Sequence, residues 1–220
     1  MRTGQLCFYA TFVVPTLIYY CAPAWLRPDP SPRFPATISY TIRRGLPKWV
    51  HHTIWLGGWH CVLGAHAGPA RPLGRAFICQ MVATGVVATV LAPCGHTVPL
   101  DALHYLGAFF YMVDHIALLR YWRMPLWSAA GFAASFLAFA VATRAKKGFK
   151  HRNGLALPVN ACPKAIEVAA AEKLGPPSAP LRARLWQLEA AEMTAEFGLF
   201  LFFVAGMDGA RCGVAPAAVL

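Results

Sequence analysis

The sequence predicts an all-α fold, a polytopic transmembrane helical bundle of about six spans that forms a single domain over residues 1–220. The composition is the first reason, because 57 % of the residues are hydrophobic and only 13 % are charged. These fractions lie well outside the usual range of soluble domains. The second reason is that the apolar residues come in separated runs, each about as long as the ~20 residues that a helix needs to cross a bilayer. Together they predict a multi-pass integral membrane protein.

Charges, prolines or glycines bound each predicted span. The spans are 6–25, 49–66, 76–93, 102–119, 122–142 and 194–212. The second is rich in Trp and His and poor in Leu and Ile, so we expect it to insert beside its neighbours. The first ends near a small-residue segment that resembles a signal-peptide cleavage site. Its apolar stretch is longer than a usual signal core, which favours an uncleaved first span.

Two connections stand out between the predicted spans. The loop 26–48 is rich in proline, which predicts extended or turn structure rather than helix. The connection 143–193 opens with RAKKGFKHR at 144–152, which we expect to be a solvated basic segment that stops translocation. A short helix is predicted at about 163–174.

The net charge of +11 arises from Lys and Arg residues that lie in the connections. They form no basic helix interleaved with stacking aromatic residues, so nucleic acid is not the expected partner. We interpret them as topology signals and as contacts to the headgroups of membrane lipids. More of them lie in the first, third and fifth connections, which predicts that both termini are outside the cytoplasm.

The seven cysteines are an odd number and have no C-x-x-C spacing. This pattern argues against a zinc site and against a disulfide framework. We therefore expect no metal site and no cofactor.

The stretch LHYLGAFFYMVDH, residues 103–115, places ionisable groups inside the fourth predicted span. At 100° per residue, Asp101, His104 and His115 lie on one helical face. An ionisable group at membrane depth costs about 2.5 to 3.5 kcal/mol, so this face should point into the bundle. We interpret His104 as a candidate functional group, Asp101 as an interfacial one, and Asp114 with His115 as the solvated far end of the span.

Glu192 and Glu196 are four residues apart and share a helical face at the start of the sixth predicted span. Either both are solvated at a helix end, or one reaches His104 to form a carboxylate and imidazole pair. Such a pair could hold a headgroup or transfer a proton. No Ser-His-Asp order, H-E-x-x-H pair or glycine-rich phosphate loop specifies a reaction. The sequence alone therefore does not identify the protein as an enzyme.

Three segments in the same order resemble one family of six-span membrane proteins. They are FPATISYT at 34–41, GVVATVLAP with VPLDALHYLGAFFYM at 85–93 and 98–112, and EMTAEFGLFLFF at 192–203. The family is that of the damage-regulated autophagy modulators (DRAM), with the Sfk-type proteins, the FGF-receptor-activating protein and the post-GPI-attachment lipid-remodelling factors. One departure is Met193, which stands where the family usually has Trp.

The resemblance implies roles for Ile38, Ser39, Tyr40, His104 and Glu192. It also implies GPI-lipid remodelling, phospholipid distribution or autophagy at the Golgi, the ER, lysosomes or other membranes. The family is usually described with a cytoplasmic N-terminus, opposite to the prediction from the charges.

We therefore expect a non-catalytic protein that binds or organises membrane lipid, with His104, Glu192, Ser39, Tyr40 and Asp101 as candidate functional residues. The alternative is a membrane-embedded lipid-remodelling enzyme that uses His104 and Glu192 as acid and base. A transporter or a b-type cytochrome is third, because inverted repeats are not evident and the histidine spacing fits two haems poorly. Whether His104 meets Glu192 would separate the first two.

Overall fold

A computed structural model of the chain describes residues 2–23, 25–26, 34–65, 72–91, 98–155, 172–176 and 179–207. The helices are α1 (Arg2–Cys21), the short α2 (Ile38–Thr41), α3 (Gly45–Ala65), α4 (Pro72–Val86), the π-helix η1 (Val87–Leu91), α5 (Val98–Tyr121), α6 (Leu126–Arg152) and α8 (Pro180–Gly206). Within these ranges no strand occurs, and the predicted all-α fold is confirmed.

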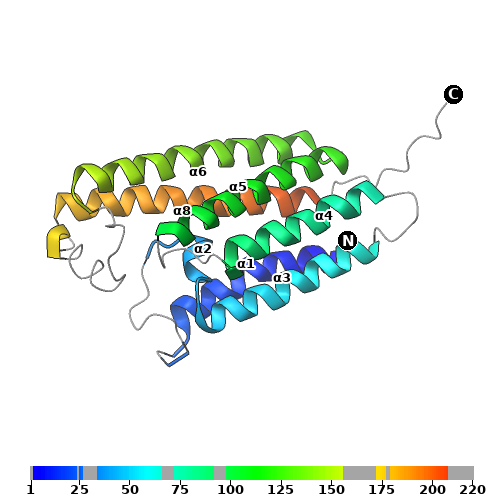
Figure 1. Cartoon of the computed structure of the whole chain (residues 1–220), viewed down its shortest axis with the longest axis horizontal. Coiled ribbons are helices and arrows are strands. Elements are labelled where there is room, and N and C mark those ends of the chain that lie inside the picture. Colours follow the sequence, from blue (N-terminus) through cyan, green and yellow to red (C-terminus); the bar gives the residue numbers. More distant parts are fainter. Residues whose placement is uncertain are drawn as a thin grey trace.

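The long helices lie lengthwise beside one another and pack as three antiparallel hairpins (Figure 1). These hairpins are α1 with α3, α4 and η1 with α5, and α6 with α8. One end of the bundle holds α2, the start of α5, the end of α6 and the start of α8, and we call it the α2 end. The turn between α5 and α6 lies at the opposite end.

Each long helix contributes at least one buried side chain to a common core. The set is Phe8, Trp59, Ile78, Leu118, Phe132 and Phe203. Aromatic side chains bury a large area each and so dominate such a core. The three hairpins are therefore parts of one bundle.

Small residues bring α6 and α8 close together. A Cβ added at Gly198 would lie 2.6 Å from Ser135 Oγ, and one added at Gly206 would overlap Ser128. The Ser128 hydroxyl donates to the Phe202 carbonyl at 2.7 Å. Small residues and hydroxyl hydrogen bonds are typical of helix contacts inside membranes, where hydrophobic driving force between helices is missing.

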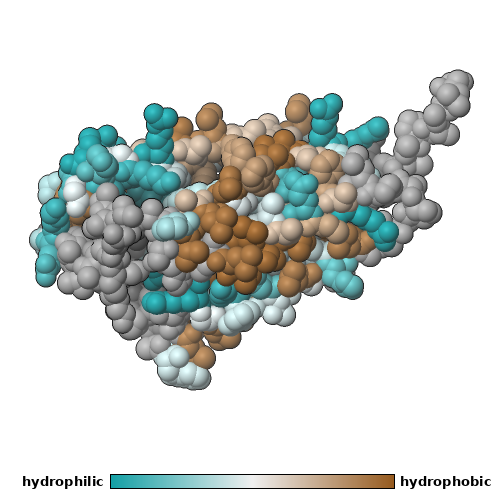
Figure 2. Space-filling view, in the orientation of Figure 1, coloured by the Kyte–Doolittle hydropathy of each residue, from teal (hydrophilic) through white to brown (hydrophobic). Residues whose placement is uncertain are grey.

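The face of the molecule shown in Figure 2 is apolar in its middle and more hydrophilic toward its ends. Along α5 one outward stripe of exposed residues, the α5 stripe, consists of Leu103, Leu106, Phe109, Phe110, Val113 and Ile116. Among the described residues, the three helices α1, α5 and α6 are long and apolar enough to cross a membrane. These features agree with a membrane protein.

The proline-rich loop 26–48 is more helical than predicted. Ile38–Thr41 forms α2, and the Thr37 side chain caps it by accepting the Tyr40 N–H at 3.4 Å. No proline lies within α2. Pro47 falls in the first turn of α3, where its missing N–H breaks no helical hydrogen bond.

Helices extend into the predicted connection 143–193 from both ends. The basic segment continues α6 to Arg152, and α8 begins at Pro180, well before the predicted start of the last span. Proline is favoured at a first helical position, where it has no hydrogen bond to lose. The predicted helix at 163–174 lies mostly outside the described residues.

A glycine ends α6. Gly154 has φ +63°, and the N–H groups of Gly154 and Leu155 donate to the carbonyls of His151 and Lys150 at 3.2 and 2.8 Å. This pair of bonds is a Schellman motif, which needs a left-handed residue that glycine adopts without strain. The basic segment is therefore a helix with its own stop signal.

Candidate functional site

Glu196 connects the first connection of the chain to the last helix. Its carboxylate accepts the Ile38 N–H at 2.5 Å and the Ser39 hydroxyl at 3.1 Å. The carboxylate is buried, and it satisfies N–H and O–H groups at the start of α2 that the short helix cannot satisfy itself. Ser39, one of the predicted site residues, therefore meets a glutamate of α8, but that glutamate is Glu196.

Glu192 lies one helical turn earlier on α8 and faces α6. It accepts a hydrogen bond from Thr143 at 2.8 Å and forms an ion pair with Lys146. A further turn back, Glu189 lies 4.0 Å from the ammonium group of Lys150. Three buried glutamates thus line one face of α8, inside the helix and not at the start of a span as predicted.

His104 lies on the hairpin of α4, η1 and α5. Its ring Nδ1 bonds to the Ala88 carbonyl of η1. Because a carbonyl only accepts, Nδ1 must carry the proton. The next turn of α5 also touches η1, since a Cβ at Gly107 would lie 3.0 Å from the Ala88 nitrogen. The missing side chain of Gly107 therefore allows α5 to approach η1 closely.

The π-helix receives a second polar contact from α3. Lys48 Nζ donates to the Val90 carbonyl at 3.4 Å, and His52 Nε2 lies 2.7 Å from the Thr89 hydroxyl. The last carbonyls of a helix have no partner within it, and donors from other elements satisfy them here. His104 and Lys48 thus fix η1 from two sides.

His104 and Glu192 bond to different helices, so they do not form the carboxylate and imidazole pair that was one of the two alternatives. The imidazole bonds to η1, whereas the carboxylate bonds to α6. Asp101 lies in the first turn of α5, where its carboxylate interacts favourably with the positive end of the helix dipole. The guanidinium group of Arg43 lies over the ring of Tyr40, 4.0 Å from its centroid. Each of these candidates therefore has a local structural partner.

Asp114 and His115 are buried and not solvated, so the prediction for them was wrong. The Asp114 carboxylate accepts from Gln80 Nε2 at 2.8 Å and from the Thr84 hydroxyl at 3.2 Å. Tertiary packing explains the difference, because α4 covers this face of α5.

His115 lies in an aromatic cage. Its Nδ1 donates to the Tyr111 carbonyl at 2.7 Å. Four aromatic rings from α5, α6 and α8 surround the imidazole with centroids 4.3 to 6.0 Å away: Tyr111, Phe132, Phe200 and Phe203. An axial ligand of haem needs its free ring nitrogen to face a space large enough for the macrocycle, and the buried His115 is enclosed by side chains, so it does not fit the cytochrome alternative.

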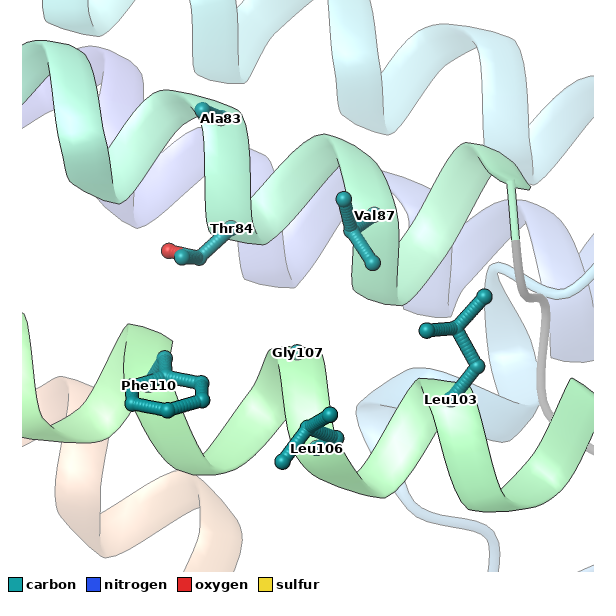
Figure 3. Close-up of a pocket in the computed structure, with 7 residues that line it drawn as sticks. All are labelled: Ala83, Thr84, Val87, Leu103, Leu106, Gly107 and Phe110. Atoms are coloured by element: carbon teal, nitrogen blue, oxygen red, sulfur yellow. The ribbon is translucent and has the colours of Figure 1, made fainter.

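An apolar groove of about 210 Å³ runs between the α4–η1 segment and α5 (Figure 3). Its lining consists of Ala83, Thr84, Val87, Leu103, Leu106, Gly107 and Phe110. Leu103 projects toward the facing helix, and Leu103 and Phe110 both belong to the exposed α5 stripe. The groove therefore opens onto the apolar outer surface.

Thr84 contributes the one hydroxyl group to this lining. That hydroxyl lies 3.2 Å from Asp114 Oδ2 and 3.1 Å from the Met81 carbonyl, so it is engaged within the protein. The accessible surface of the groove is entirely apolar. Chemically it can hold hydrocarbon, and it offers nothing to an ion or a headgroup.

Sequence reasoning missed the groove and the Asp114 cluster. A signal for the cluster existed, because Gln80 and Thr84 are four residues apart and share a face of α4. Among the described residues, no group of three or more His, Cys, Asp or Glu side chains could hold a metal ion.

The chain was compared with protein families, curated proteins and solved structures. No family model, curated protein or solved structure matches it. The resemblance to the DRAM-like families stays a prediction, and the geometry of the groove and the polar clusters carries the functional argument.

Proposed function

We propose that this chain is a multi-pass membrane protein that binds membrane lipid without itself catalysing a reaction, and that the groove between α4–η1 and α5 holds an acyl chain. The groove carries the proposal, because its surface is wholly apolar and it opens onto the α5 stripe. A surface of that kind is covered by hydrocarbon when α5 crosses a bilayer.

Packing, rather than the hydrophobic effect, gives a groove its preference for one chain. Lipid tails are as apolar as leucine, so an acyl chain gains little by leaving the bilayer for an apolar surface as such. It gains by filling a concave space with close contacts that a flat helix face does not offer. Gly107 lines this space and has no side chain to fill it.

The fixed position of η1 also supports the proposal. Val87 of η1 forms part of the groove wall, and His104 and Lys48 hold neighbouring carbonyls of the same turn. His104 is then a positioning residue for the groove. The six-span arrangement and the endomembrane location that the DRAM-like resemblance implies belong to the same proposal.

The enzyme alternative has no assembled acid and base pair to support it. It requires His104 and Glu192 to act on one substrate, yet their partners are the Ala88 carbonyl and the Lys146 and Thr143 side chains. General acid–base catalysis needs both groups within hydrogen-bond reach of the reacting atoms.

Photo-crosslinking tests the groove. The full-length protein is reconstituted with phosphatidylcholine that carries a diazirine in one acyl chain, and the labelled peptides are mapped. Labelling should concentrate on the facing segments of α4 and α5. Ala83→Phe should reduce labelling there several-fold, because Ala83 lines the groove and the phenyl ring occupies its volume.

Ala134→Phe is the matched control, because Ala134 is an exposed alanine on α6, away from the groove. It should leave the labelling of α4 and α5 unchanged. Even labelling of all outward-facing helices in the unmodified protein would contradict the proposal, because it would show ordinary annular lipid only.

A further inference from the structure

The outer face of α6 changes from apolar to basic within about one helical turn. Leu137 and Val141 are 66 % and 59 % exposed, and Arg144 and Lys147 follow on the same side of the helix and are exposed as well. Three residues of helix advance by about 4.5 Å, so Val141 and Arg144 are close in depth. The change is therefore a sharp boundary on one continuous helix.

The inner face of the same segment is neutralised. Lys146 and Lys150 face α8, where Glu192 and Glu189 are their partners. Within the described parts of the chain, no carboxylate lies within ion-pair distance of Arg144, Lys147 or Arg152. The acidic groups of α8 thus compensate only the lysines that point inward.

The exposed surface of the α2 end is consequently positive. Its exposed described cations and histidine are Arg44, Arg144, Lys147, His151, Arg152, Lys173 and Arg184. Among the described acidic residues at this end, Glu172 is exposed and Asp101 is half-exposed, whereas the three glutamates of α8 are buried. The hydrophilic character of this end is visible in Figure 2.

Aromatic side chains mark the boundary between the basic and apolar surfaces. The Lys147 ammonium group lies 3.8 Å above the ring of Tyr105, which is exposed beside the α5 stripe. Trp49 of α3 and Trp186 of α8 are also exposed. Exposed Trp and Tyr rings beside apolar surface are typical of the membrane–water interface.

We propose that Arg144 and Lys147 form a binding site for the phosphate group of anionic membrane lipids, whose acyl chains lie along Leu137, Val141 and the α5 stripe. Two cations less than one turn apart attract a lipid with net negative charge more strongly than a zwitterionic lipid. The immediate change to apolar surface fits an amphiphile and not a nucleic acid, whose charge continues along its backbone. The site depends on membrane insertion, but not on the acyl-chain groove.

Native mass spectrometry tests the site. The full-length protein is exposed to equal amounts of phosphatidylserine and phosphatidylcholine, and the bound lipids are counted. The double variant Arg144→Gln, Lys147→Gln should lose the preference for phosphatidylserine by roughly 30-fold, at about 5-fold for each cation near an anionic headgroup.

Two further variants control the experiment. Arg144→Lys with Lys147→Arg keeps both charges and should keep the preference. Arg75→Gln with Arg120→Gln removes two exposed charges at the opposite end and should also keep it. Helical content measured by circular dichroism confirms that each variant is folded.

The proposed site would be overturned if the double glutamine variant kept its preference for phosphatidylserine, or if the opposite-end control lost it equally. It would also be overturned if the double glutamine variant lost bound RNA or protein without any change in its lipid preference. Ala83→Phe separates this site from the groove. It should alter acyl-chain crosslinking and leave the phosphatidylserine preference unchanged, so either proposal can fail alone.

Discussion

Glu196 shows how one side chain can hold two distant segments of this chain together. It is 158 residues from Ile38 in sequence, yet its buried carboxylate receives the N–H of that residue and the hydroxyl of Ser39. A buried donor that loses its acceptor costs about 1 to 3 kcal/mol. Glu196 therefore stabilises the position of α2 on the bundle.

Replacing Glu196 by Ala should lower the free energy of unfolding by about 1 to 3 kcal/mol, because the Ile38 N–H and the Ser39 hydroxyl lose their acceptor. Glu196→Gln keeps an amide oxygen that can accept one of these bonds, and its loss should be smaller. Thermal unfolding of both variants in the same detergent measures the difference. Equal losses for Ala and Gln would show that the hydrogen bonds to α2 do not carry the effect.

The sequence could identify some of the important residues but not their partners. The four-residue spacing of Glu192 and Glu196 predicts a shared helical face, and the structure places both on the buried face of α8. Their partners, however, come from α6 and from the first connection, and only tertiary packing brings these segments to α8. The burial of Asp114 has the same origin, since Gln80 on α4 supplies its donor.

At the scale of elements, α8 has two halves with different packing. Its first half buries Glu189, Glu192 and Glu196 against lysines and α2, whereas its second half buries Leu199 and Phe203 in the core. At Gly206 the second half of α8 lies so close to Ser128 of α6 that an added Cβ would overlap it. The hairpin of α6 and α8 is therefore ionic at the α2 end and tightly packed at the opposite end.

Gly206→Ala should destabilise the protein by about 1 to 3 kcal/mol, because the added methyl group would overlap Ser128 and push α8 away from α6. Gly57→Ala is the control. A Cβ at Gly57 meets no atom within 4 Å, and alanine is the better helix former. Stability measured by thermal unfolding should fall for the first variant and stay equal or rise for the second, and the reverse order would contradict the close α6–α8 contact.

Hydropathy predicts where helices are apolar, but not where they end. The predicted boundaries of α6 and α8 stop at the first charges, whereas the helices continue through 143–152 and 180–193. Charges placed on the inward face of one helix are compensated by those of the next, and a single sequence does not show that pairing. Pro180 and Gly154 were local signals of the true ends.

At the scale of the whole molecule, the bundle has a basic α2 end, and the face shown in Figure 2 is apolar in its middle. The order of the described long helices could be predicted from the apolar runs. The groove could not, because it depends on the relative position of two helices and on the π-helical turn.

Both termini should lie outside the cytoplasm, with the basic α2 end inside it, because Lys and Arg are retained on the cytoplasmic side. Glycosylation acceptor sites added at either terminus should be modified in cells. An acceptor site inserted in the connection between α6 and α8 should stay unmodified. The opposite pattern would favour the cytoplasmic N-terminus that is usual in the DRAM-like families.

The buried glutamates of α8 also bear on how the chain enters the bilayer during synthesis. The described part of α6 is long and apolar enough to cross a membrane, whereas α8 does not meet that criterion. At the depth of Lys146 and Lys150, a carboxylate that leaves the translocon without a counter-ion lies at the headgroup level, where anionic lipids repel it. Because Lys146 and Lys150 of α6 are the partners of Glu192 and Glu189, the two helices are suited to leave the translocon as a preassembled pair. In that case α8 would leave the translocon laterally only when its ion pairs with α6 have formed.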